Sequence, residues 1–492
     1  MNFLKISKFS LVFTLLFFSG KGYSQNKPNI ILIMADDLGY GDVGFNGNTI
    51  IKTPSMDKMA ASGMKFTNFY SGGPVCSPTR GTCLTGRHYY RYGIFSANIG
   101  HLPEAEITLP ELLKDHGYVT GHFGKWHIGT LSKELSSKGA SRKPELNYSP
   151  PALHKYDESF VTESSVATWT PKGSTGSPKN PYYHNGVVEK ENLSGDDSRV
   201  MMDRVIPFIE KASKEKNPFL SVIWFHAPHE PIKAGPEYKK MYSQYSEGKQ
   251  DFYGCITAMD DQIGRLQNKL KELKIDENTI IMFCSDNGPE GKAESDKHPG
   301  TTGGLRGRKR SLYCGGVGVP AFVVWPNVVK PGTITNYMSG TMDYVPTVLD
   351  LLNISMPDDR PLDGASLIPM LKGKESSRII PIPFMHRGKA AWIQGDLKYL
   401  TQGKKVSEVY NLRTDRFEET NLIKKYPEKV AAMNKYIMDW NLSCKNSHAG
   451  LDYPISFNPV DEWVGLDAPK QTGNKKNKKN KKNKKNKKNH KS

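Results

Sequence analysis

Three uninterrupted apolar runs, each ending abruptly in polar residues, constrain the fold of this 492-residue chain more than any other feature. They span residues 29–34, 219–225 and 279–284, and they run into ADDLG, HAPH and SDNG respectively. Amphipathic patterns with apolar residues at spacings of three and four lie between them, as in residues 108–116 and 252–273. This alternation predicts an α/β fold in which helices cover both faces of a large, mostly parallel sheet. In such sheets ligands bind at the carboxyl ends of the strands, so the three polar ends should meet at one edge.

The hydrophobic pattern of the sequence changes after about residue 376, where the apolar runs become shorter and alternate with polar residues. A small antiparallel sheet with a helix packed on it is predicted there, from runs at residues 379–385, 390–393, 398–401 and 409–412 and a helical pattern at 427–442. We therefore expect four segments: a leader (1–24), a main domain (25–375), a C-terminal α+β subdomain (376–468) and a disordered tail rich in Lys and Asn (469–492).

The first 24 residues have the pattern of a secretory signal peptide. Lys5 and Lys8 precede an apolar run at residues 11–18, and Gly22-Tyr23-Ser24 offers a small-x-small cleavage site. The run is shorter than the roughly 18 apolar residues that a membrane helix needs, and no later segment reaches that length. We expect an exported protein, periplasmic or secreted, with no membrane span.

The formal net charge of +18 is concentrated at the two ends of the chain. Residues 475–491 of the tail hold eleven lysines and the leader holds three, neither stretch holds an acidic residue, and the rest of the chain carries only +4. The charge therefore does not indicate a nucleic-acid partner for the folded body. Two readings of the tail stay open: a solvated appendage without a specific role, or an electrostatic contact with an acidic polysaccharide or cell envelope.

Six cysteines are too few to form a disulfide scaffold in a chain of this length, although some of them could pair after export. The chain has no CxxC pair, which argues against a structural zinc site. Cys76 and Cys83 stand out because they lie close together in PVCSPTRGTCLTGR, a segment without hydrophobic periodicity.

Acidic and amide side chains follow two of the apolar runs. Asp36 and Asp37 come after the first run, and Asp286 and Asn287 come after the run at 279–284. The adjacent Asp36 and Asp37 can face one ligand only if the chain turns there. Each pair alone is more typical of a helix cap or turn, but their matching positions favour a shared site. An all-oxygen ligand set suits Ca²⁺, and less well Mg²⁺, rather than zinc.

Cationic and imidazole side chains lie in loops or extended segments that could surround this site. Lys125 and His127 lie two residues apart in GKWHIG, His229 follows the apolar run at 219–225, and Lys309 lies in the basic run GGLRGRKR. A lone histidine near a loop is more often a structural hydrogen bonder. Cations gathered around a metal, however, are typical of a pocket for an anion.

Several motifs in order along the chain resemble those of the type I, formylglycine-dependent sulfatases of the alkaline phosphatase superfamily. CSPTR, which begins at Cys76 and ends at Arg80, resembles their CxPxR hallmark, and LTGR follows it; Cys83 lacks the proline. The resemblance extends to DDLGYGD, GYVTGHFGKWHIG, APHEP, SDNG and the C-terminal VYNLRTDRFEETNL, and it covers roughly residues 28–425. It implies an alkaline-phosphatase-like fold, with the main domain as the catalytic one.

The resemblance also implies roles for individual residues. Cys76 would be oxidised to formylglycine (3-oxoalanine) by a formylglycine-generating or sulfatase-maturating enzyme. The hydrated aldehyde is an oxygen nucleophile whose second hydroxyl lets it expel the captured sulfate. Ca²⁺ would polarise the sulfate, Arg80 and Lys125 would orient the nucleophile and the sulfate, His127 would act as base, and His229 with Lys309 would assist the leaving alcohol. The calcium ligands would be Asp36, Asp37, Cys76 as formylglycine, Asp286 and Asn287.

The substrate class follows less directly from the sequence. Export and a tail that attracts polyanions favour a sulfated polysaccharide or oligosaccharide. The insert at residues 131–185 reads as irregular and should shape the pocket, with Tyr182, Tyr183 and His184 either contacting sugar or acting as structural filler. The segment at residues 314–320 reads CGGVGVP and lacks the acid and arginine of the related EGGxRxP, which should affect local packing. Two alternatives remain: a phosphate or phosphonate monoester hydrolase, and a non-catalytic glycan-binding protein.

Overall fold

The computed structural model describes residues 27–468 except residues 172–179, 375–376, 456 and 458. The predicted signal peptide (1–24) and the predicted disordered tail (469–492) both lie outside the described residues. Among the helices that the structure describes, none combines the length and the apolar character needed to cross a membrane.

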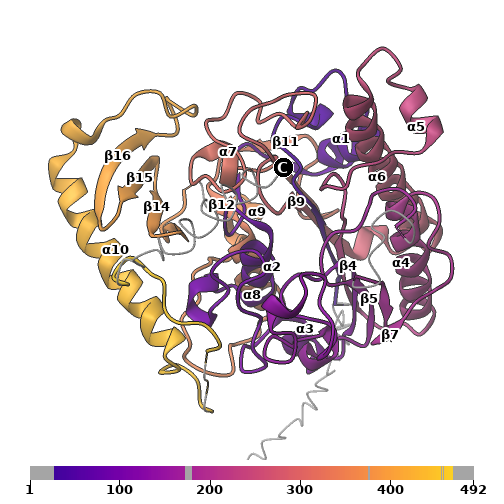
Figure 1. The fold of residues 1–492 in the computed structure, drawn as a ribbon, viewed down its shortest axis with the longest axis horizontal. Helices are drawn as coiled ribbons and strands as arrows, with labels where there is room; N and C mark the ends of the chain where they lie inside the picture. The colour runs from indigo at the N-terminus through magenta and orange to yellow at the C-terminus, as the bar shows by residue number, and fades with distance from the viewer. Residues whose placement is uncertain (1–26, 172–179, 375–376, 456, 458, 469–492) are drawn as a thin grey trace, which may run out of the picture.

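A ten-stranded, mostly parallel sheet forms the centre of the molecule (Figure 1). Strand β1 (Asn29–Ala35) lies between β8 (Phe219–Trp224) and β9 (Thr279–Ser285), and both neighbours run parallel to it. The three apolar runs of the sequence are thus adjacent parallel strands, as predicted. The sheet continues through β4 (Val119–Lys125), β5 (Glu158–Thr162), β6 (Tyr183–His184) and β7 (Val187–Val188) on one side, and through β10 (Ala321–Val324), β2 (Met64–Phe66) and β11 (Thr333–Thr335) on the other.

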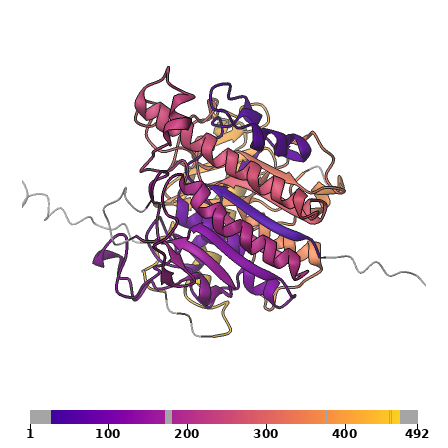
Figure 2. The same ribbon diagram turned by 90° about the vertical axis from the view of Figure 1, so that its right-hand side faces the viewer.

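Helices cover both faces of this sheet and create two hydrophobic cores (Figure 2). Successive side chains of a strand point to opposite faces, so Ile30 and Leu32 of β1 enter one core while Ile31 and Ile33 enter the other. Burying each of these side chains contributes about 1.5–3 kcal/mol. The second core contains α1 (Pro54–Ser62), α4 (Asp197–Lys214) and α6 (Glu247–Glu272), and the first contains α2 (Cys76–Thr85), α3 (Leu109–Lys114) and α8 (Tyr344–Leu352).

The C-terminal part of the chain forms a four-stranded antiparallel sheet that packs beside the main body (Figure 1). One face of this sheet contributes Trp392 to the core that contains Trp440 of the terminal helix, while the other face packs Phe384 with Tyr70 and Met342 of the main body. The predicted antiparallel sheet and helix are both present: β13 (Ile382–His386), β14 (Lys389–Gln394), β15 (Leu397–Gln402), β16 (Lys405–Asn411) and α10 (Pro427–His448). The domain boundaries themselves remain a prediction.

Two expectations from the sequence need correction. The segment at residues 131–185 is not wholly irregular, because it supplies β5 and begins β6 of the main sheet. All six cysteines are buried and unpaired, so none of them forms a disulfide.

The remaining short strands and α-helices are β3 (Phe69–Tyr70), β12 (Ser339–Gly340), α5 (Pro236–Lys240), α7 (Cys314–Val317) and α9 (Ile368–Leu371).

Candidate active site

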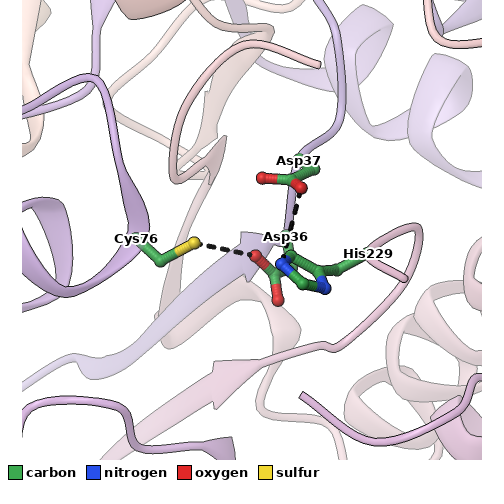
Figure 3. A group of neighbouring side chains, drawn as sticks. All are labelled: Asp36, Asp37, Cys76 and His229. Carbon is green, nitrogen blue, oxygen red and sulfur yellow. Dashed lines mark hydrogen bonds and ion pairs between the residues drawn. The ribbon is translucent and has the colours of Figure 1, made fainter. Parts of the chain in front are cut away.

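The polar residues after the central strands meet at one edge of the sheet, as the parallel arrangement predicts. Figure 3 shows Cys76, Asp36, Asp37 and His229 together, with the thiol and the imidazole approaching the two carboxylates from different sides. One ligand atom from each of these four residues lies within 4.8 Å of the others. Strands β1 and β8 and helix α2 therefore deliver an acidic pair, an imidazole and a thiol to a single point.

A turn at Asp37 lets both neighbouring carboxylates face this point. Asp37 has a φ of 66°, in the left-handed region, so the chain reverses at the aspartate rather than at the glycines that follow. Its backbone N–H donates to Asp286 Oδ1 at 3.0 Å, and the Asn287 side-chain amide donates to Asp37 Oδ1 at 2.6 Å. These bonds tie the end of β1 to the end of β9.

Cys76 is the first residue of α2, so the partial positive charge of a helix N-terminus faces the site. Its Sγ donates to Asp36 Oδ1 at 3.4 Å, and the side chain is almost completely buried. Burial raises the pKa of the Cys76 thiol, and the negative charge of Asp286 raises it further. The unmodified residue is therefore a neutral thiol, which is a poor nucleophile.

Two buried cations hold the carboxylates of Asp36 and Asp286. Arg80 Nη2 lies 2.8 Å from Asp286 Oδ2 and 3.5 Å from Asp36 Oδ1, and Lys125 Nζ lies 2.6 Å from Asp36 Oδ2. Burial alone would raise the pKa of Asp36, but Lys125 and the neighbouring cations hold it well below its ordinary value. Arg80 also donates to the backbone carbonyl of Lys125, so α2 and β4 are joined inside the site.

On the other side of the site, Lys309 and His229 approach Asp37. Lys309 Nζ lies 2.6 and 2.7 Å from the two oxygens of Asp37, and His229 Nε2 lies 3.6 Å from Oδ2. His229 Nδ1 is 2.6 Å from the carbonyl oxygen of Glu230, so Nδ1 carries the hydrogen and a neutral ring has its lone pair on Nε2. Burial lowers the pKa of His229 to about 4.

His127 presents the other tautomer. Its Nε2 lies 3.0 Å from Asn98 Oδ1, an acceptor, so Nε2 carries the hydrogen. Nδ1 is buried and has no hydrogen-bond partner among the described residues, which leaves its lone pair free. Burial, together with Lys125 and Arg80, holds the pKa of His127 well below its ordinary value. A neutral imidazole with a free lone pair can accept a proton.

The oxygen atoms of the site fit a calcium ion. Asn287 Oδ1 is buried without a hydrogen-bond partner among the described residues, so this oxygen is available as a metal ligand. Burial and the nearby charge of Asp36 raise the pKa of Asp286 to about 7. A divalent cation between these groups would bind the free amide oxygen and remove the repulsion between the carboxylates. Carboxylate and amide oxygens are the donors that Ca²⁺ prefers.

A cavity of about 410 Å³ opens above these groups. Cys76, His127, His229 and Lys309 all line it, and part of the 131–185 segment lines it as well. Tyr182 instead lies in the core, where its hydroxyl donates to Asp197, and neither Tyr183 nor His184 lines the cavity. Because none of these three residues lines the cavity, their positions favour the structural reading over contact with sugar.

The sequence analysis missed several residues that support the site. Ser165 donates to Asp36 Oδ2 at 2.9 Å, and Glu290 pairs with Lys309 at 3.5 Å. Ser165 follows β5 just as the aspartates follow β1, so the rule about strand ends could have found it. Asn98, which fixes the tautomer of His127, lies in an irregular loop that carries no such signal.

Comparisons with known proteins agree on one family. A family model described as Sulfatase matches residues 28–354, and one described as N-sulphoglucosamine sulphohydrolase, C-terminal, matches residues 308–428. N-acetylgalactosamine-6-sulfatase of Sus scrofa is 32% identical over 385 residues, which cover 73% of this chain and 69% of the relative. Arylsulfatase A of Homo sapiens is 32% identical over 485 residues, which cover 90% and 92%.

Among solved structures, this fold is similar to that of Ps i-CgsB in complex with k-i-k-neocarrahexaose. The two share a TM-score of 0.74 and 27% sequence identity, and the match covers 87% of this chain and 97% of the other. The similarity spans the large sheet and extends into the C-terminal part of the chain.

Proposed function

The chain belongs to the sulfatase family, and we propose that it removes sulfate from a sulfated carbohydrate by means of Cys76 converted to formylglycine. The observation that carries the proposal is the place of Cys76, at a helix N-terminus, beside Asp36 and in a cavity lined by Lys309 and His127. A neutral thiol cannot do this chemistry, whereas the hydrated aldehyde supplies an oxygen nucleophile and can later expel sulfate.

The other residues of the site have the charges and hydrogen bonds that this reaction requires. Asp36, Asp37, Asp286 and Asn287 would hold Ca²⁺, which polarises the sulfate when bound. Arg80 and Lys125 would orient the group derived from Cys76. Lys125 and Lys309 would offset the negative charge on the sulfate oxygens.

The two histidines would move protons in opposite directions. His127 has a free lone pair on Nδ1 and would act as the base. His229 has its lone pair on Nε2 and must first bind a proton before it can donate to the leaving alcohol. The negative charge of a bound sulfate ester would raise the pKa of His229 and favour that protonation.

The choice of a carbohydrate rests on the relatives. Both a relative named for N-acetylgalactosamine 6-sulfate and a similar structure with a bound neocarrahexaose point to sulfated sugars. We further infer export to the periplasm or medium from the leader, and maturation by a formylglycine-generating or sulfatase-maturating enzyme.

The test measures release of sulfate and of phosphate side by side, with N-acetylgalactosamine 6-sulfate as the first sugar and matched phosphate esters as competitors. We expect sulfate release from protein of the native host, and loss of that release in Cys76→Ala. Mass spectrometry of the peptide containing Cys76 should find the aldehyde. Dominant phosphate release would favour a phosphatase, and an unconverted thiol would favour a non-catalytic binding protein.

A further inference from the structure

The cavity above Cys76 carries more positive charge than one sulfate requires. Beyond Lys309, its lining includes three more cations from three separate segments of the chain, Lys138, Arg310 and Arg387, and a single acid, Glu230. Arg310 is neutralised by Glu290, whose two oxygens lie 2.6 and 2.9 Å from its guanidinium. Within the residues that the structure describes, neither the Lys138 ammonium nor the Arg387 guanidinium has an ion-pair or hydrogen-bond partner.

Lys138 is held at the cavity wall by its neighbours. The side chains of Ser136 and Ser137 donate to Glu163 Oε1 at 2.6 and 3.0 Å, and the carbonyl of Glu163 accepts the backbone N–H of His127. The segment that carries Lys138 is therefore fixed to Glu163, which follows β5 and also bonds to the backbone of His127. Burial and the charge of Lys125 lower the pKa of Lys138, while the charge of Glu163 raises it.

Arg387 lies at the tip of the hairpin between β13 and β14, where His386 pairs with Lys389. Arg387 has a φ of 50° and Gly388 a φ of 72°, so both central residues of the turn are left-handed. Asn, Asp and Gly adopt this conformation more easily than Arg does. Asp37, Asn98 and His127 of the site share this conformation, but so do residues in turns elsewhere, such as Lys216 and Lys274. The case for Arg387 therefore rests on its place in the cavity lining.

We propose that Lys138 and Arg387 bind anionic groups of the substrate other than the sulfate that is removed. The substrate would then be a saccharide with at least two anionic groups, either sulfates or a sulfate and a carboxylate. Both residues line the cavity while remaining exposed to solvent, so each can contact an anionic group that extends outward from the site at Cys76. This inference rests on the proposed function, because it assumes that one sulfate occupies the site at Cys76.

The experiment measures binding rather than turnover, by calorimetry on the Cys76→Ala variant with calcium present. The probes are N-acetylgalactosamine 6-sulfate, N-acetylgalactosamine 4,6-disulfate and the unsaturated chondroitin disaccharide 6-sulfate, which adds a carboxylate instead of a second sulfate. We expect at least one of the two doubly charged probes to bind about tenfold more tightly than the monosulfate. Whichever one does so identifies the second anionic group.

Three further substitutions in the same background assign this gain to residues. Arg387→Gln and Lys138→Gln should each reduce, about threefold, the ratio of the affinity for that doubly charged probe to the affinity for the monosulfate. Lys389→Gln, on the same hairpin but outside the cavity lining, should leave the ratio unchanged. The inference would be overturned if all probes bound with equal affinity, or if no probe bound. It would also be overturned if both variants lost affinity equally for the monosulfate and for the doubly charged probe. Sulfate release by the unsubstituted protein is measured separately, so a failure of the proposed function can be told apart from a failure of this inference.

Discussion

The side chains of the basic run at residues 305–310 contact different partners. Arg306 donates to the Tyr410 hydroxyl and to the carbonyl of Glu418, and Arg308 donates to the carbonyls of Glu290 and Gly300. Only Lys309 of this run reaches Asp37. The sequence could not select it among neighbouring cations, because the choice depends on left-handed turns at Gly307 and Arg310.

The first prediction concerns this lysine. Lys309→Gln should lower kcat for sulfate release roughly 100-fold, because it removes a positioned cation from the sulfate oxygens and leaves Asp37 without its ion pair. Arg306→Gln is the matched control from the same run, and it should retain kcat close to that of the unsubstituted protein. Steady-state kinetics on samples with matched circular dichroism spectra provide the measurement. A Lys309→Gln enzyme with nearly full kcat would contradict the role given to this residue.

Among the elements, the strands that carry the site were the most predictable part of the molecule. The continuous apolar runs indicated a parallel sheet, and parallel strands bring their carboxyl ends to one edge, so Asp36 and Asp286 could be placed together before any coordinates. Arg387 could not be placed in this way, because its hairpin reaches the cavity only through the packing of the C-terminal sheet on the main body. Residues on loops and hairpins from distant segments depend on such tertiary contacts, which no local pattern encodes.

Helix α4 begins at an aspartate whose charge opposes folding. Asp196 is the N-cap and accepts the backbone N–H of Arg199 at 2.9 Å. Burial, with the charge of Asp197, raises its pKa to about 7. The value in the unfolded chain is about 4, so the folded state binds the proton more tightly. The contribution that the protonated Asp196 carboxyl makes to folding stability is therefore complete below pH 4, and it is lost as the pH rises through 7.

Asp196→Asn should keep the cap and remove this cost. We expect the variant to gain about 1–3 kcal/mol in free energy of unfolding relative to the unsubstituted protein between pH 5 and pH 8. Urea unfolding at both pH values, with calcium held constant, gives the difference. Asp203→Asn on the same helix should have the opposite effect, because Asn192 and two arginines hold the pKa of Asp203 below its ordinary value despite its burial. A gain that does not depend on pH would refute the electrostatic explanation.

At the scale of the whole molecule, a buried ion pair of the main body also accepts a hydrogen bond from the C-terminal helix. Arg91 lies 2.7 Å from Asp363 through Nε and 2.8 Å through Nη2, and Trp440 of α10 donates to the same carboxylate at 3.0 Å. Arg91 and Trp440 also belong to segments that pack in direct contact. The main body and α10 should therefore unfold together.

Arg91→Met should leave the Asp363 carboxylate buried without its cation and cost about 3–5 kcal/mol in free energy of unfolding. Arg91→Met combined with Asp363→Asn should recover part of that loss, because no buried charge then remains unpaired. Chemical denaturation followed by tryptophan fluorescence and by circular dichroism tests both points. Two separate transitions in the unsubstituted protein, or a loss below about 1 kcal/mol in the single variant, would contradict the coupling.

The position of β1 sets an order of events during synthesis. Both neighbours of this strand in the sheet are made about 190 to 250 residues after it, as when Ile30 pairs with Leu220 and Ile280. At a ribosomal rate of about 5–20 residues per second, roughly 10–40 seconds separate Cys76 from the completion of β9. During that interval the edge of the sheet that later encloses the thiol does not yet exist. The maturating enzyme that our proposal requires would find Cys76 accessible in that interval, whereas the finished fold buries the thiol.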